Sequence, residues 1–180
     1  MTVQLVYETH SITEDNERGI ATGWLPGCLS ERGRAAARAL GARRRADDIA
    51  AVFTSDLARA VETAEIAFDC SPVPLLRDWR LRECDYGAGN GSATADMHVH
   101  RAEHLDEPYP AGESWRAAVA RVSRVLPDLW FRWSERRVLL IGHMATYYAL
   151  EHRLRDIPLE QLLTEPFDWQ EGWEYELPAP

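Results

Sequence analysis

The chain has 180 residues, of which 46% are hydrophobic and 27% are charged, and its formal net charge is -9. These values suit one globular domain, so we expect residues 1–180 to fold as a single unit with a real core. The acidic balance excludes a general nucleic-acid binder, which needs positive charge to meet phosphate. No apolar run approaches the roughly 18 residues that cross a bilayer, so we expect no membrane segment and a cytoplasmic location.

The three cysteines, Cys28, Cys70 and Cys84, are odd in number and show no CxxC spacing. Neither a disulfide framework nor a cysteine zinc site is indicated. Cys84 lies next to Glu83 in the sequence, but no neighbouring histidine or helix N-terminus would activate it. We therefore expect a passive thiol there.

The first half of the chain alternates between short apolar runs and helical patterns. The expected elements are a strand at residues 3–7, a helix capped by Ser30 that runs to Arg44, a strand at 50–54, a helix capped by Ser55 that runs to about Phe68, and an extended piece at 73–76. The basic cluster at 43–45 would then be a solvated helix end that favours the C-terminal dipole.

The second half begins with its least patterned stretch, residues 94–110, which holds three of the six histidines. The later elements are a long amphipathic helix at 113–133 that Pro127 kinks or splits, a doubly covered strand at 138–141, a helix at 145–154 and a tail from Ile157 ending in an edge strand. Strands that alternate with helices predict an α/β three-layer sandwich with a mostly parallel sheet.

Reactive side chains follow the predicted strands at the edge where ligands gather in parallel sheets. They are His10, Arg59, Glu83 and His143, from four separate segments. Neutral imidazole is a competent nucleophile toward phosphorus, and Arg binds phosphate oxygens bidentately. A carboxylic acid nearby could protonate a leaving oxygen, and the helix after His143 would aim backbone N–H groups at the anion.

Six short motifs, weak singly but strong in this order, resemble the histidine phosphatase superfamily, whose small members include cofactor-dependent phosphoglycerate mutases and phosphatase relatives. They are Thr9-His10-Ser11-Ile12-Thr13-Glu14-Asp15-Asn16, the loop Gly23 to Gly33, Thr54-Ser55-Asp56-Leu57-Ala58-Arg59-Ala60-Val61-Glu62-Thr63-Ala64, Leu81-Arg82-Glu83-Cys84-Asp85-Tyr86-Gly87, Pro110-Ala111-Gly112-Glu113-Ser114 and Ile141-Gly142-His143-Met144-Ala145. The resemblance covers about residues 3–154.

The resemblance implies a phosphoglycerate mutase-like fold with a lid or specificity insertion at about residues 87–112. It also implies a metal-independent phosphohydrolase without a cofactor, acting on a small phosphorylated metabolite. His10 would be the nucleophile, Glu83 the acid, and Arg59, His143 and Asn16 the groups that hold the phosphoryl oxygens. The insertion is short for a mutase, which must protect its phosphohistidine from water. The oligomeric state, monomer or homodimer, is not specified by any pattern.

The first motif departs from the family pattern. Thr9 replaces the family's Arg, Ser11 its Gly and Ile12 its Glu, while Met144 replaces the Gly after the second histidine. Losing one phosphate-binding Arg removes a charge-assisted bond worth about 1.5–3 kcal/mol. Either Arg18 or Arg82 enters the site in its place, or the substrate is not an ordinary phosphate monoester. With Asn16, we take Thr9, Ser11, Met144 and Arg82 as candidate substrate-binding residues.

Competing interpretations remain open. A metal site at His98, His100 and His104 is less expected than a polar lid or surface segment, although His100 and His104 would share one face of a helix. Glu62 is expected to support Arg59 rather than to react. The chain could instead catalyse a non-phosphatase reaction on the same fold, or bind a phosphorylated ligand or protein partner without turnover.

Overall fold

The computed structural model describes residues 1–180 and is built on a five-stranded sheet with the order β4-β3-β6-β1-β7. The strands are β1 (Val3–Thr9), β3 (Ile49–Thr54), β4 (Leu75–Arg77), β6 (Arg137–Gly142) and β7 (Trp173–Leu177). All neighbouring pairs are parallel except β1 with β7, the edge strand at the C-terminal end. The predicted α/β class with a mostly parallel sheet is confirmed.

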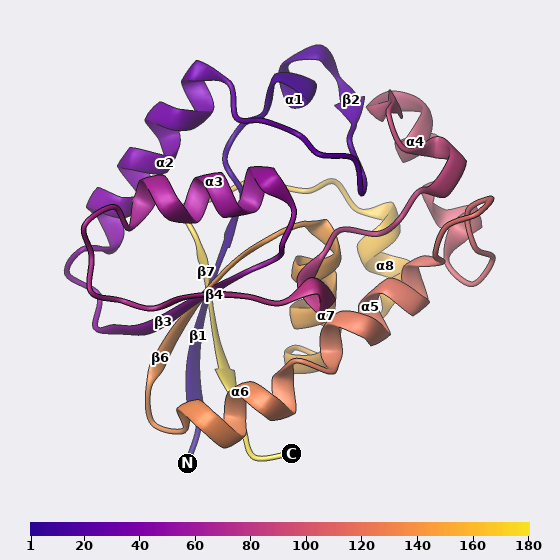
Figure 1. The fold of residues 1–180 in the computed structure, drawn as a ribbon. Coiled ribbons are helices and arrows are strands. Elements are labelled where there is room, and N and C mark those ends of the chain that lie inside the picture. Colours follow the sequence, from indigo (N-terminus) through magenta and orange to yellow (C-terminus); the bar gives the residue numbers. More distant parts are fainter.

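Helices cover both faces of the sheet (Figure 1). On one side lie α2 (Glu31–Arg44) and α3 (Ala58–Ala67); on the other lie α5 (Trp115–Ser123), α6 (Leu126–Trp133), α7 (Met144–Leu154) and α8 (Leu159–Thr164). Side chains alternate accordingly, since Leu5 belongs to the larger core cluster and Val6 to the smaller one beneath α2 and α3. The apolar run of β6 is buried on both faces, which is typical of a central parallel strand.

The helical stretch expected over 113–133 is split at Pro127, one of the two expected outcomes: α5 ends at Ser123, and α6 starts at Leu126 with Pro127 in its first turn, where the missing N–H does no harm. Two other boundaries differ from the sequence-based expectation. Ser55 does not cap α3, which begins at Ala58 after Leu57; the Ser55 hydroxyl contacts His143 instead. The extended piece expected at 73–76 is β4, which starts two residues later and ends one residue later.

A small subassembly covers the carboxyl ends of the central strands (Figure 1). It contains α1 (Glu14–Arg18), β2 (Ile20–Ala21), β5 (Ser92–Ala93) and α4 (Thr94–His100). Three short 3-10 turns complete the chain: η1 (Trp79–Leu81), which contacts α5, η2 (Gly87–Gly89), and η3 (Arg101–His104), which contacts α4 and α8. Pairing of β2 with β5 ties the loop after β1 to the stretch that the sequence left least patterned. None of the helices is long and apolar enough to cross a membrane.

The contact between α2 and α3 gives a test of the packing. A Cβ at Gly41 would overlap the carbonyl oxygen of Ala67. We expect Gly41→Ala to lower the free energy of unfolding by about 1–3 kcal/mol through overpacking, measured by urea denaturation. In an exposed helix the same change stabilises by about 1 kcal/mol, so a stabilised variant would contradict this packing.

Candidate active site

His10 directly follows β1, and its backbone N–H donates to the carbonyl of Gly142 at 2.9 Å, which extends the β1–β6 ladder by one residue. Its ring Nδ1 lies 2.8 Å from the carbonyl oxygen of Ser11. Because a carbonyl can only accept, Nδ1 carries the proton and Nε2 has a free lone pair. Arg59 donates from Nε to that same Nε2 at 3.3 Å, as expected for an unprotonated nitrogen.

Arg59 joins the two histidines. Its guanidinium donates from Nη2 to the carbonyl of Gly23 at 2.8 Å and to Nδ1 of His143 at 3.4 Å. Since arginine can only donate, Nδ1 of His143 accepts, and Nε2–H donates to the Ser55 hydroxyl 2.7 Å away. The two imidazole rings lie 5.1 Å apart, centroid to centroid.

Burial and Arg59 keep both imidazoles neutral. Desolvation, followed by the positive charge of Arg59, lowers the pKa of His10 to about 3. The same two causes, with a contribution from His10, lower the pKa of His143 well below its usual value. Burial also lowers the pKa of Arg59, whose side chain is 2% exposed. The hydrogen bonds of this guanidinium go to carbonyl oxygens and imidazole nitrogens, and none goes to a carboxylate.

Glu83 lies at the N-terminus of α7. Its carboxylate accepts from the backbone N–H groups of Met144 at 3.1 Å, Ala145 at 3.0 Å and Cys84 at 2.9 Å. Two of these are orphan donors of the first helical turn, where negative charge is favourable. The helix N–H groups that were expected to face a bound anion therefore hold Glu83 in this structure.

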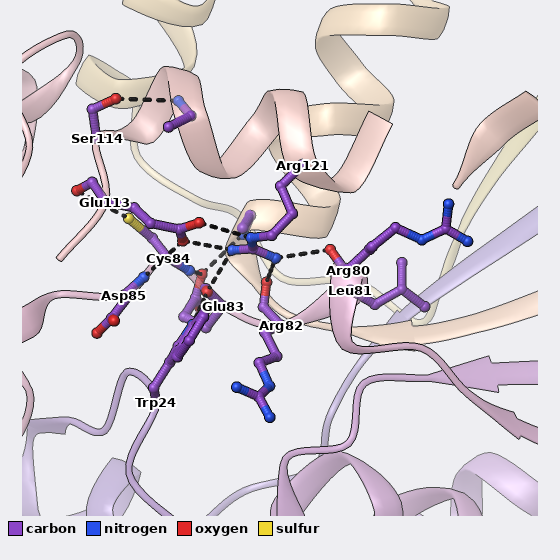
Figure 2. A network of polar contacts seen from close by, with 12 residues as sticks. Trp24, Arg80, Leu81, Arg82, Glu83, Cys84, Asp85, Glu113, Ser114 and Arg121 are labelled. Atoms are coloured by element: carbon purple, nitrogen blue, oxygen red, sulfur yellow. Dashed lines mark hydrogen bonds and ion pairs between the residues drawn. The ribbon is translucent and has the colours of Figure 1, made fainter. Parts of the chain in front are cut away.

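Arg121 fixes the segment that carries Glu83 (Figure 2). Its side chain is 4% exposed and donates to three backbone carbonyls, those of Arg80, Arg82 and Glu83. It also forms an ion pair at 2.7 Å with Glu113, which lies in the motif before α5. Trp24 donates to the Glu83 carbonyl at 2.6 Å from the opposite side. Sequence reasoning missed Arg121, and the adjacent Gly-Glu-Ser motif was the one signal near it.

These side chains open into one cavity of about 620 Å³. Eight of the nine candidate residues line it: Thr9, His10, Ser11, Asn16, Arg59, Glu83, His143 and Met144. Thr9 accepts a hydrogen bond from the indole of Trp169, 3.1 Å away. Asn16 uses its side-chain oxygen in the capping box of α1.

Arg82 does not line the cavity. Its guanidinium makes a bidentate pair with Asp56 at 2.7 and 2.6 Å and lies over the Trp24 ring. Arg18 is exposed and pairs with Glu14 and Asp15. Neither arginine replaces the family's missing one, because each is already held by carboxylates away from the cavity.

A different arginine, Arg43, does line the cavity, although its sequence context indicated a solvated helix end. It donates to both carboxylate oxygens of Glu8, at 3.1 and 3.0 Å, and lies 3.7 Å from Glu171. Glu8 is 1% exposed and also pairs with Arg44. The charge of Arg43 is thus already compensated.

The three histidines expected in the lid segment differ in their surroundings. His98 lines the cavity from α4, whereas His100 pairs with Glu103 and His104 stacks on Tyr109. No group of three or more His, Cys, Asp or Glu side chains is arranged to hold a metal ion.

Cys84 is fully buried, and burial raises the pKa of its thiol, which fits a passive side chain. Glu62 does not contact the Arg59 guanidinium through a hydrogen bond; it accepts from the Leu29 backbone N–H at 3.0 Å and from Arg34 at 2.9 Å, so it supports the loop before α2 instead.

The site thus combines a mostly parallel α/β sheet with two histidines and an arginine at the carboxyl edge of that sheet. The family model described as histidine phosphatase superfamily (branch 1) matches residues 9–169. The chain belongs to this superfamily, and the resemblance seen in its motifs is confirmed.

Individual relatives carry mutase and phosphatase names. A 2,3-bisphosphoglycerate-dependent phosphoglycerate mutase of Bifidobacterium longum is 36% identical over 125 residues, covering 67% of this chain and 48% of that protein. The chain thus spans about half the length of the curated relatives it first matches. The structure of Bacillus stearothermophilus YhfR has a TM-score of 0.84 at 30% identity, covering 94% of this chain and 88% of that one.

A mycobacterial glucosyl-3-phosphoglycerate phosphatase in complex with VO3 is also similar in structure. It has a TM-score of 0.80 at 26% identity and covers 89% of this chain and 85% of its own. The fold is therefore shared with a phosphatase of known structure.

The state of His10 can be measured directly. Its lowered pKa, about 3, predicts that the ring resonances of His10 do not titrate between about pH 5 and 8, whereas a free histidine titrates near 6.5. Two-dimensional NMR of ring-labelled protein, with His10→Gln to assign the signal, tests this. A midpoint between about pH 5.5 and 7.5 would contradict the described environment.

The role of Arg121 as a positioning residue is also testable. Arg121→Leu leaves Glu113 and three carbonyls without their donor, so we expect a loss of about 3–5 kcal/mol in unfolding free energy. Arg121→Lys restores the charge but not the fork of donors, and it should lower kcat more than it raises KM because Glu83 is displaced. Equal kcat in Arg121→Lys and wild type would contradict this role.

Proposed function

We propose that the chain is a metal-independent phosphohydrolase that cleaves a small phosphate monoester through a phosphohistidine on His10. The main support is the buried guanidinium of Arg59, which has no carboxylate partner and lies beside a histidine with a free Nε2 lone pair. A desolvated positive charge next to a neutral nucleophile suits an anionic electrophile, and phosphate is the anion that arginine binds best.

In the first step, Nε2 of His10 attacks phosphorus, forming the N–P bond as the P–O bond to the alcohol breaks. Glu83 donates its proton to the leaving oxygen. In the second step, Glu83 takes a proton from water, the hydroxide oxygen bonds to phosphorus, and the N–P bond breaks to release phosphate and restore His10.

The phosphoryl oxygens have several donors within the cavity. Arg59 supplies the charge, and His143 orients its guanidinium through Nδ1, because the Nε2–H of His143 is held by Ser55. The Met144 backbone N–H becomes available when Glu83 moves toward the leaving oxygen. Asn16 offers its side-chain amide, whose oxygen is already engaged. The Thr9 hydroxyl, an acceptor from Trp169, still has its own proton to donate in place of the missing arginine.

Hydrolysis is favoured over mutase activity by the short segment between Gly87 and Pro110. We propose that this segment, with α4, is the lid, because Thr94, Met97 and His98 line the cavity. It leaves little chain with which to shield a phosphohistidine from water. A non-phosphatase reaction on this fold is the second candidate, favoured by Thr9 and Ile12 in the cavity wall.

Activity with matched variants tests the proposal. Wild type should release phosphate from p-nitrophenyl phosphate and from alkyl phosphates, and His10→Ala should lose both activities. Glu83→Gln should lower kcat on alkyl phosphates by about 10²–10⁴-fold but far less on p-nitrophenyl phosphate, whose leaving group needs no proton. His100→Ala, whose side chain pairs with Glu103 outside the cavity, is the control.

Rapid acid-free quenching of a reaction with ³²P-labelled ester should trap a base-stable label on wild type and none on His10→Ala. A folded wild type that releases no phosphate from any ester would overturn the proposal. Tight binding of phosphate esters without release would assign the chain to a binding role instead.

A further inference from the structure

The cavity extends well beyond the four catalytic candidates. One wall is a stripe on α2, where Ala36, Ala39 and Leu40 face the cavity at helical spacing. Phe167 and Trp169, from the segment before β7, also line the cavity, and the same segment approaches α2 where Glu171 lies 3.7 Å from Arg43. We call the part of the cavity that these five residues line the side lobe. All five are apolar, and two of them are alanines, which take up little space.

The side lobe lies where the chain departs from its family. Thr9 and Ile12, which replace the Arg and Glu of the first motif, both line the same cavity. Trp169 is 59% exposed, yet its indole N–H is held by the Thr9 hydroxyl at 3.1 Å. A hydrogen bond therefore fixes a large aromatic ring at the cavity wall without burying it, and a planar group could stack on it.

The charges of the cavity argue against a second anionic group. Its charged lining residues are Arg43 and Arg59 with Glu8, Glu83 and Glu171, two positive against three negative. Arg43 is already paired with Glu8 at 3.0 Å, so Arg59 alone remains for an anion. A ligand that brought a carboxylate in addition to its phosphate would face net repulsion.

We propose that the side lobe binds the organic part of the substrate, which is the phosphate monoester of an uncharged alcohol carrying a planar apolar group. This rests on the proposed phosphohydrolase function and names its substrate class. The cavity volume of about 620 Å³ far exceeds a phosphate and falls in the range of sites that enclose a whole small molecule. Substrates with a second acid, such as phosphoglycerates, are excluded by charge.

Three primary alkyl phosphates of similar intrinsic reactivity test this: benzyl phosphate, ethyl phosphate and 3-phosphoglycerate. We expect kcat/KM for benzyl phosphate to exceed that for the other two by about 10-fold or more, the scale of pocket contacts to apolar groups. Ala39→Trp fills the side lobe and should remove about 10-fold from benzyl phosphate while leaving ethyl phosphate within about 2-fold. Ala35→Trp, on the exposed face of the same helix and outside the cavity, should change neither.

Trp169→Ala provides a second variant that does not enlarge any side chain, and it should lower benzyl phosphate turnover selectively. Equal effects of Ala39→Trp on benzyl and ethyl phosphate would overturn the side lobe as the alcohol site. A preference for 3-phosphoglycerate would overturn the exclusion of a second anion. Absence of phosphate release from all three esters would instead be a failure of the phosphohydrolase function itself, so the two proposals fail in distinguishable ways.

Discussion

The uncompensated guanidinium of Arg59 is the interaction on which the site depends. It is almost fully buried, and its hydrogen bonds end on carbonyl oxygens and on both catalytic-edge imidazoles. Its positive charge, added to burial, is what holds His10 and His143 in the neutral state. In the function that we propose, this one desolvated charge prepares the nucleophile and attracts an anion at the same time.

The pairing of the strands brings these groups to the same edge of the sheet. In the parallel register of β1 and β6, Thr9 lies opposite Gly142, so the residue after each strand is a histidine at the same height. The N-terminus of α7 starts immediately after His143 and holds Glu83, while Arg121 ties Glu83 and the residues before it to α5. The carboxylate of the acid candidate is thus held by backbone N–H groups, and its backbone carbonyl is held by Arg121 and Trp24.

The residues that depart from the family pattern in the first motif all line the same cavity. Replacement of an arginine by Thr9 removes charge, and the Thr9 hydroxyl accepts a hydrogen bond from the indole of Trp169. Ile12 and the small side chains of α2 extend an apolar wall from the same point. The proposed phosphate site therefore has one arginine in a cavity that several apolar side chains also line, a combination better suited to neutral alcohols than to polyanions.

The sequence by itself determined the alternation of strands and helices, the strand ends at His10 and His143, and the family, because those signals are local patterns and motif spacings. It also predicted that Arg59 and Glu83 belong to the candidate site. Only the tertiary structure decided that Arg82 and Arg18 stay outside the cavity, that Ser55 orients His143, and that Trp169 meets Thr9 across 160 positions. Those outcomes depend on which side chains pair across distant segments, and periodicity along one chain carries no information about such pairing.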